Sequence, residues 1–100
     1  MNAGFDKLLL LNNIFMVSGN KILIADDEPD ILEIIESNLQ ANGYEVITAK
    51  NGNEAFEKAK QFVPDLIILD IMMPGKNGIE VCNLLRMMPA FKETLIVFLT

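Results

Sequence analysis

The chain has 100 residues, of which 51% are hydrophobic and 22% charged, so it can form the core of one small domain and is not a disordered tail. Its net charge is −6, and its Lys and Arg residues form no stripe that would attract nucleic-acid phosphates. It has a single cysteine, Cys82, and no histidine. These counts exclude an internal disulfide, catalysis by a Ser-His-Asp triad and a histidine-ligated zinc site, and they predict a cytoplasmic protein.

Residues 1–20 are predicted to be an N-terminal extension that is not part of the fold. The apolar runs at 8–11 and 14–17 are interrupted by two asparagines and are too short to cross a bilayer, which takes about 20 residues. No small-residue cleavage site follows them, as a signal peptide would require. Because Met16 lies just before the first predicted strand, we expect the natural start of the domain near Met16, with no membrane association.

The rest of the chain alternates strand patterns with helix patterns. Strands are predicted at 21–26, 44–49, 66–70 and 94–100, which are rich in aliphatic, β-branched and aromatic side chains. Helices are predicted from Pro29 to Gly43, from the turn at 51–53 to Pro64, and from Ile79 to Met88-Pro89. This alternation predicts an α/β fold with a doubly wound parallel sheet in the flavodoxin-like order 2-1-3-4.

Acidic side chains follow two of these strands at the point where each strand ends. Asp70 closes the apolar run 66–69, just before a Pro/Gly turn, and Asp26 and Asp27 follow the run 21–25. In the predicted order the first and third strands are neighbours, and ligands of such sheets bind at the carboxyl ends of the strands. Thr100, at the end of the neighbouring fourth strand, is expected at the same edge. The sequence therefore predicts one crevice that gathers three carboxylates and a hydroxyl.

This grouping limits the chemistry of the crevice. Two carboxylates about 4 Å apart repel each other by about 4 kcal/mol at an effective dielectric constant of about 20, so they must bind a cation, take up protons or point apart. A set of oxygen ligands without histidine suits Mg²⁺, which leaves coordination positions for a phosphate. One carboxylate can then attack phosphorus to form an aspartyl-phosphate, and the Thr100 hydroxyl can hydrogen-bond a phosphoryl oxygen.

The sequence resembles a response-regulator receiver domain over about residues 21–100. The motifs that carry the resemblance are Asp26-Asp27, Leu69-Asp70, Met73-Pro74, Gly78 and Phe98-Leu99-Thr100. The resemblance implies a phosphoprotein of a two-component system, which takes a phosphoryl group from a histidine kinase or a phosphotransfer protein in phosphorelay signal transduction. It also implies a domain that is not itself an enzyme, although it can catalyse its own phosphotransfer and dephosphorylation.

The resemblance further implies a role for each residue of the crevice. Asp70 corresponds to the phosphoacceptor and Thr100 to the switch hydroxyl. Asp27 corresponds to the acid that contacts Mg²⁺ directly, and Asp26 to the acid that acts through water. Met72 corresponds to the residue whose backbone carbonyl binds the metal. Glu28 is expected to support the start of the first helix, with a minor role near the metal as the alternative.

The family pattern continues past Thr100 with a further helix, a fifth strand that carries a phosphoryl-binding lysine, and a closing helix. Lys76 and Lys92 do not match that lysine and are expected in solvated loops. The alternative function is therefore an unphosphorylated interaction module or an inactive remnant. The run 95–99 would then form an exposed sheet edge, which predicts self-association. A hydrolytic phosphotransferase is disfavoured because position 72, where an Asp-x-Asp motif needs an acid, is Met.

Overall fold

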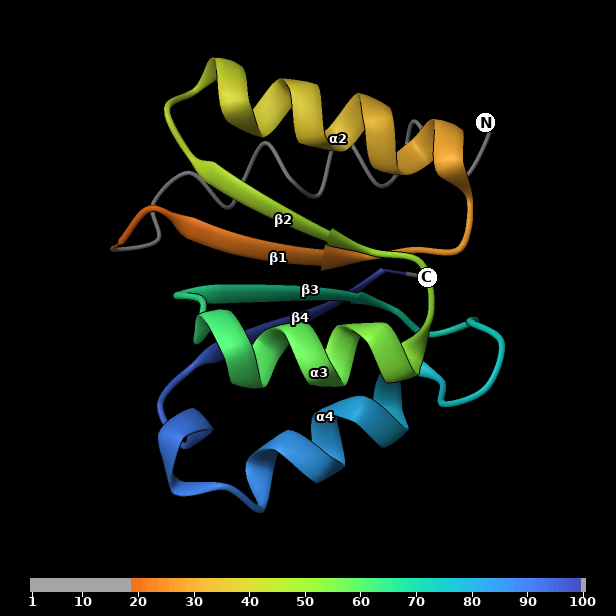
Figure 1. Cartoon of the computed structure of the whole chain (residues 1–100), viewed down its shortest axis with the longest axis vertical. Helices are drawn as coiled ribbons and strands as arrows, with labels where there is room; N and C mark the ends of the chain where they lie inside the picture. Colours follow the sequence, from red (N-terminus) through yellow and green to blue (C-terminus); the bar gives the residue numbers. More distant parts are fainter. Residues whose placement is uncertain (1–18, 100) are drawn as a thin grey trace.

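The computed structural model describes residues 19–99, which form a four-stranded parallel sheet covered by helices on both faces (Figure 1). The strand order is β2-β1-β3-β4, as predicted. The strands are β1 (Lys21–Ala25), β2 (Glu45–Ala49), β3 (Leu66–Asp70) and β4 (Leu95–Leu99). The α/β fold class and the order of the strands inferred from the sequence are therefore confirmed.

Helix α2 (Pro29–Ala41) lies on one face of the sheet, whereas α3 (Gly52–Phe62) and α4 (Gly78–Arg86) lie side by side on the other (Figure 1). A short 3₁₀ helix, η1 (Pro89–Phe91), connects α4 to β4. In the part of the chain that the structure describes, no helix has the length and apolar character that a membrane span requires.

Each strand sends alternate side chains into two separate cores. On the α2 face, Ile22 and Ile24 of β1 and Ile68 of β3 pack with Leu32, Ile35 and Leu39 of the helix. On the opposite face, the other side chains of β1 and β3 pack against α3 and α4. Because both faces are covered, every side chain of β3 is buried, which explains its unbroken apolar sequence.

The helices begin where the sequence places their caps. Pro29 opens α2, and Asn51 caps α3 by accepting a hydrogen bond from the Glu54 N–H (2.8 Å). Asn77 and Glu80 form a reciprocal capping box at α4. The ends differ slightly from expectation, since α2 ends before the Gly43 turn (φ 90°) and α3 ends in a left-handed Val63 (φ 44°). Strands β2 and β4 each begin one residue later than predicted.

The connection between α4 and β4 contains a core residue that the sequence pattern did not indicate. Phe91, the last residue of η1, is 1% exposed and belongs to the core on the α3 and α4 side. The Arg86 guanidinium supports this connection, because its Nη1 donates to the carbonyls of Phe91 (2.6 Å) and Thr94 (2.8 Å). The connection is therefore a packed segment and not merely a solvated loop.

Lys58 forms an ion pair within α3 and a hydrogen bond that links this helix to β2. Lys58 Nζ donates to Glu54 Oε1 (2.9 Å) and to the Thr48 carbonyl (2.6 Å). The hydrogen bond from Lys58 is the main reason why the pKa of the Glu54 carboxyl is lowered from 4.5. Because the folded-state pKa lies below that of the unfolded chain, the pair stabilises the fold at neutral pH, and this contribution is lost as the pH falls through the lowered pKa.

We expect Glu54→Gln to reduce the free energy of unfolding at neutral pH by less than about 1 kcal/mol, since solvent screens this partly exposed pair. In acid, where Glu54 is protonated in both states, the variant and the wild type should differ less. Urea unfolding at the two pH values measures the difference. Glu57→Gln, which alters the more exposed pair with Lys60, is the control and should show a smaller pH dependence. Equal losses at both pH values would contradict the assignment to the Glu54 charge.

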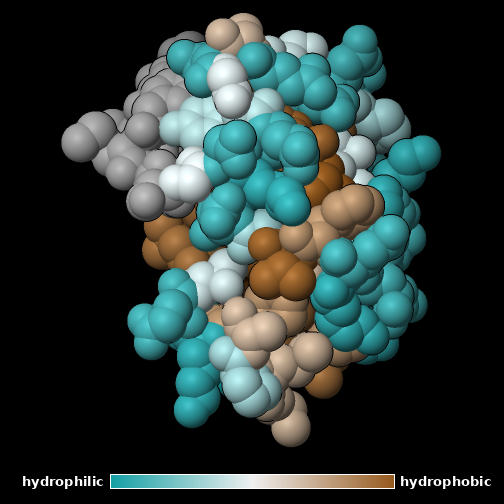
Figure 2. All heavy atoms as spheres, turned by 60° about the vertical axis from the view of Figure 1, so that its left-hand side comes forward, coloured by the Kyte–Doolittle hydropathy of each residue, from teal (hydrophilic) through white to brown (hydrophobic). Residues whose placement is uncertain are grey.

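Hydrophobic side chains also reach the surface in places among hydrophilic ones (Figure 2). The exposed large side chains include Ile79 and Leu95, each 47% exposed. Leu95 begins β4, which pairs with β3 on one side and stands at the edge of the sheet formed by residues 19–99. This edge position agrees with the one expected for the run 95–99.

Candidate metal centre

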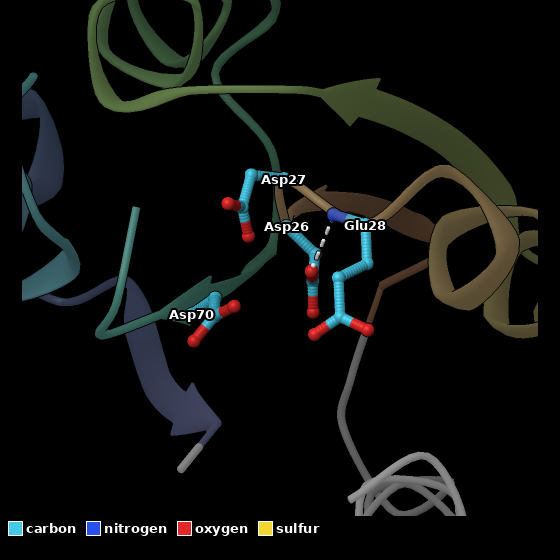
Figure 3. A group of neighbouring side chains, drawn as sticks. All are labelled: Asp26, Asp27, Glu28 and Asp70. Carbon is cyan, nitrogen blue, oxygen red and sulfur yellow. Dashed lines mark hydrogen bonds between the residues drawn. The ribbon is translucent and has the colours of Figure 1, made fainter. Parts of the chain in front are cut away.

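Parallel pairing of β1 with β3 brings the acidic residues of two distant segments together. Ala25 pairs with Leu69, so the residues that follow, Asp26 and Asp70, emerge at the same edge of the sheet. Figure 3 shows the side chains of Asp26, Asp27, Glu28 and Asp70 gathered beyond the ends of these strands. One carboxylate oxygen from each residue lies within 4.8 Å of the others. The three carboxylates expected at this edge thus lie close together, with Glu28 as a fourth acid.

The two inner carboxylates are buried and held by backbone donors. Asp26 is 0% exposed and Asp70 is 5% exposed. Asp26 Oδ1 accepts a hydrogen bond from the Glu28 N–H (2.9 Å), and Asp70 Oδ1 accepts one from the Met72 N–H (3.1 Å). These turns fix the orientation of both carboxylates before any ligand arrives. Asp27 and Glu28 are exposed and complete the cluster from the solvent side.

Glu28 lies both at the start of α2 and in the acidic cluster. It occupies the N-cap position of α2, but its side chain makes no capping hydrogen bond. Its carboxylate instead belongs to the acidic cluster (Figure 3). Glu28 does stand at the start of the helix, where its backbone carbonyl accepts from the Leu32 N–H (3.1 Å), and the position of its side chain also agrees with the alternative near the metal site. The preference of a residue for a helix cap depends on its neighbours in the sequence, so it could not show that the Glu28 carboxylate lies near Asp70 of β3.

The loop after Asp70 forms the adjoining wall. A shallow pocket of about 380 Å³ is lined by Ile71, Met72, Met73, Gly75 and Asn77. The Met72 side chain is 79% exposed, whereas Met73 is 7% exposed and packs in the core. Met72 therefore faces the crevice with its backbone N–H and leaves its side chain in solvent, while Met73 anchors the loop.

Some predicted features fall outside the described residues. Thr100 is one of them, although its predecessor Leu99 is described, is buried and pairs with Asp70. Residues 1–18 of the predicted N-terminal extension, including Met16, are also outside. The role of Thr100 and the boundary of the extension stay predictions.

The acidic cluster is chemically suited to a hard divalent cation. All four candidate ligands are carboxylates, and two of them are buried, where water cannot fully screen their repulsion. Mg²⁺ and Ca²⁺ prefer oxygen ligands, and Mg²⁺ is commonly held by one or two carboxylates with water and phosphate completing its coordination. The residues present therefore fit Mg²⁺.

Comparison with known proteins gives one consistent family. Residues 22–100 match the family model of the response regulator receiver domain. Over 66 residues the chain is 53% identical to the alkaline phosphatase synthesis transcriptional regulatory protein PhoP of Bacillus subtilis. That alignment covers 66% of this chain and 28% of PhoP, so the chain spans less than a third of that regulator.

Solved structures share the fold at substantial sequence identity. The chemotaxis response regulator CheY4 of Vibrio cholerae superposes with a TM-score of 0.78 at 38% identity, covering 81% of this chain and 68% of CheY4. The response regulator TrrA of Thermotoga maritima, solved in complex with Mg²⁺-BeF, gives 0.67 at 43% identity, covering 79% and 65% of the two chains. Another structure holds TrrA in complex with the histidine kinase ThkA. This chain belongs to the receiver domain family of two-component response regulators.

Proposed function

We propose that the chain accepts a phosphoryl group on Asp70 in a phosphorelay. The observation that carries the proposal is the position of Asp70, which is 5% exposed and lies within 4.8 Å of three other carboxylates. A cluster of four acids favours a divalent cation and a phosphoryl group that binds to it.

The residues of the cluster divide into metal ligands and a nucleophile. Asp26 and Asp27, Asp70 itself and the backbone carbonyl of Met72 are the proposed ligands of Mg²⁺. When bound, Mg²⁺ supplies positive charge that offsets the carboxylate repulsion and neutralises phosphoryl oxygens. The N–H of Met72 holds Asp70 Oδ1 and so orients the carboxylate. A carboxylate oxygen of Asp70 forms the new bond to phosphorus while the donor's bond to phosphorus breaks and its electron pair leaves with the donor.

The proposed donor is a histidine kinase or a phosphotransfer protein. This chain has no histidine of its own, so a phosphohistidine would have to come from a partner. The relative TrrA has been solved both with a histidine kinase and with Mg²⁺-BeF, which supports the same kind of partner and metal here. We propose Thr100 as the hydroxyl that contacts the phosphoryl group after transfer, on the basis of the family resemblance.

The test is labelling by a small phosphoryl donor. Full-length chain incubated with acetyl phosphate and Mg²⁺ should gain the mass of one phosphoryl group, located at Asp70 by peptide mapping. Chelation of Mg²⁺ with EDTA should prevent the gain. Hydroxylamine should attack the acyl carbon, release inorganic phosphate and leave a hydroxamate at Asp70, as expected for a carboxylic–phosphoric anhydride and not for a phosphoserine. No gain at saturating Mg²⁺ would refute the proposal and favour the unphosphorylated interaction module.

The exposed edge of β4 carries a second, separate prediction of self-association. Leu95 is 47% exposed, and β4 offers unpaired backbone groups along its outer side within the described sheet. We expect the sedimentation coefficient of the chain to rise with concentration, and Leu95→Lys to reduce this rise because the added charge opposes edge pairing. Ile79→Lys, at an equally exposed position on α4, is the matched control and should leave it unchanged. A wild type that sediments as a monomer at every concentration would contradict the prediction.

A further inference from the structure

The first residue of α3 lies in unusually close contact with the loop that follows Asp70. A β-carbon built on Gly52 would lie 1.9 Å from the carbonyl oxygen of Lys76 and 2.7 Å from its carbonyl carbon. Gly52 is buried, and the neighbour is backbone, so no change of rotamer could make room. Only a glycine lets the loop approach the helix this closely.

Two sets of contacts hold the loop 71–77 in place, one where it leaves β3 and enters α4 and one at Lys76. At its base, the Gly78 N–H donates to the Ile71 carbonyl (3.1 Å), and a β-carbon on Gly78 would lie 2.5 Å from the Asp70 carbonyl. At its tip, Lys76 Nζ donates to Asn53 Oδ1 (2.7 Å), next to the Gly52 contact. Lys76 lies in a loop, as expected from the sequence, and its side chain is anchored there to Asn53. Between these two points lies Met72, whose N–H holds the Asp70 carboxylate.

We propose that Gly52 is a positioning residue for the metal centre. The start of α3 fixes the position of the loop 71–77 through its contact with Lys76. The loop in this position keeps the Met72 N–H within hydrogen-bonding distance of the Asp70 carboxylate. Gly52 itself touches neither metal nor phosphoryl group and acts through the Lys76 backbone. This inference rests on the proposed function, since it concerns the affinity of the same site for Mg²⁺.

The distance by which alanine at position 52 would displace the loop indicates how strongly Mg²⁺ binding should be weakened. A real β-carbon keeps at least 3.0 Å from such an atom, so an alanine at position 52 must push the loop or the helix by about 1 Å. Displacements of about 1 Å in a preorganised site can reduce its performance by as much as about 100-fold. Because alanine is a better helix former than glycine, any loss at this position must come from the contact and not from helix propensity.

The experiment measures Mg²⁺ affinity of the full chain by NMR titration, with the Mg²⁺ dependence of acetyl phosphate labelling as a second readout. We expect Gly52→Ala to weaken Mg²⁺ binding about 3- to 10-fold, as a partial loss of preorganisation implies. Its labelling rate should recover toward the wild-type value at saturating Mg²⁺. A merely unfolded fraction would instead lower the labelled amount at every Mg²⁺ concentration.

Two further sets of variants keep the inference testable. Gly43→Ala is the matched control, because its φ of 90° makes alanine strained while nothing lies within 4 Å of the new β-carbon. It should lose stability but keep the wild-type Mg²⁺ affinity. If Gly52→Ala does not fold, Asn53→Ala and Lys76→Ala test the same contact between α3 and the loop, because each removes the hydrogen bond between the two side chains. Each variant should weaken Mg²⁺ binding about 2-fold. The double variant should weaken it no more than either single variant, because both remove the same hydrogen bond. Lys76→Arg, which keeps the donor, should bind Mg²⁺ like the wild type.

The outcomes separate the inference from the function on which it rests. Wild-type Mg²⁺ affinity in a folded Gly52→Ala variant would overturn the positioning role and leave the proposed function intact. Where that variant does not fold, unchanged affinity in both Asn53→Ala and Lys76→Ala would overturn it in the same way. A wild type that binds no Mg²⁺ would overturn the proposed function itself.

Discussion

The Asp70→Asn variant is expected to lose phosphoryl transfer completely and to become more stable than the wild type in the absence of Mg²⁺. An amide is not a nucleophile toward phosphorus, so no covalent intermediate forms. The amide oxygen of the asparagine can still accept the hydrogen bond from Met72, so the local turn is kept. A variant that loses phosphoryl transfer but gains stability would show that the acidic cluster serves the function of the protein at a cost to its stability.

The expected gain of stability follows from the spacing of the carboxylates. At the 4.8 Å limit of the cluster, each pair of charges costs about 3 kcal/mol at an effective dielectric constant of about 20. Because Asp27 and Glu28 are exposed, water screens their share, and we expect a net gain of about 1–2 kcal/mol. In the wild type we expect Mg²⁺ to offset the same repulsion and to stabilise the fold by mass action.

Labelling with acetyl phosphate measures the first effect, and urea unfolding with and without Mg²⁺ measures the second. The matched control is Asp30→Asn in the first turn of α2, which removes an acid outside the cluster. It should keep labelling and keep the stabilisation by Mg²⁺. Residual labelling of Asp70→Asn would show that another residue accepts the phosphoryl group. A destabilised Asp70→Asn variant would show that repulsion between these carboxylates does not limit the stability of the fold.

Phe91→Ala is expected to have the largest effect on stability. Phe91 is 1% exposed and packs in the core shared by β1, β3, α3 and α4. Truncation of a buried phenylalanine to alanine costs about 3–5 kcal/mol, from lost burial and from the cavity that remains. Small domains are stable by only about 5–15 kcal/mol, so the variant should be close to unfolding at room temperature.

Thermal and urea unfolding followed by circular dichroism measure this loss. Phe62→Ala provides the matched control, since Phe62 is 36% exposed at the end of α3. We expect it to cost less than about 1 kcal/mol, as is usual for surface substitutions. Similar losses in the two variants would mean that the connection around η1 is not part of the cooperative core.

The position of Asp26 and Asp70 could be predicted from the sequence because two patterns, the apolar runs and the alternation of strands with helices, point to the same edge of the sheet. The strands before Asp26 and Asp70 are continuous apolar runs, which is the pattern of strands buried on both faces. The alternation with helices then leaves few topologies, and in the flavodoxin-like one these two strands are neighbours. The pairing of Ala25 with Leu69 agrees with that reasoning.

The features that the sequence did not reveal depend on contacts between distant segments. Phe91 stands between polar and small residues in a short connection, where no helical or strand period marks it as buried. Glu28 has the position of a helix cap, and only the fold shows its carboxylate beside Asp70. The approach of Gly52 to Lys76 has no local signature beyond the glycine itself.

The pairing of β1 with β3 also has a consequence for how the protein folds. Each parallel pair in this sheet joins strands separated by at least one helix, and β1 and β3 are separated by α2, β2 and α3, so no two neighbours can form as a simple hairpin. Asp26, which follows β1, meets Asp70 only after the segment between β1 and β3 has folded and the two strands have paired, and in an unfolded chain the two acids would lie far apart. We therefore expect bound Mg²⁺ to slow unfolding, because the carboxylates of its proposed site move apart when β1 and β3 separate.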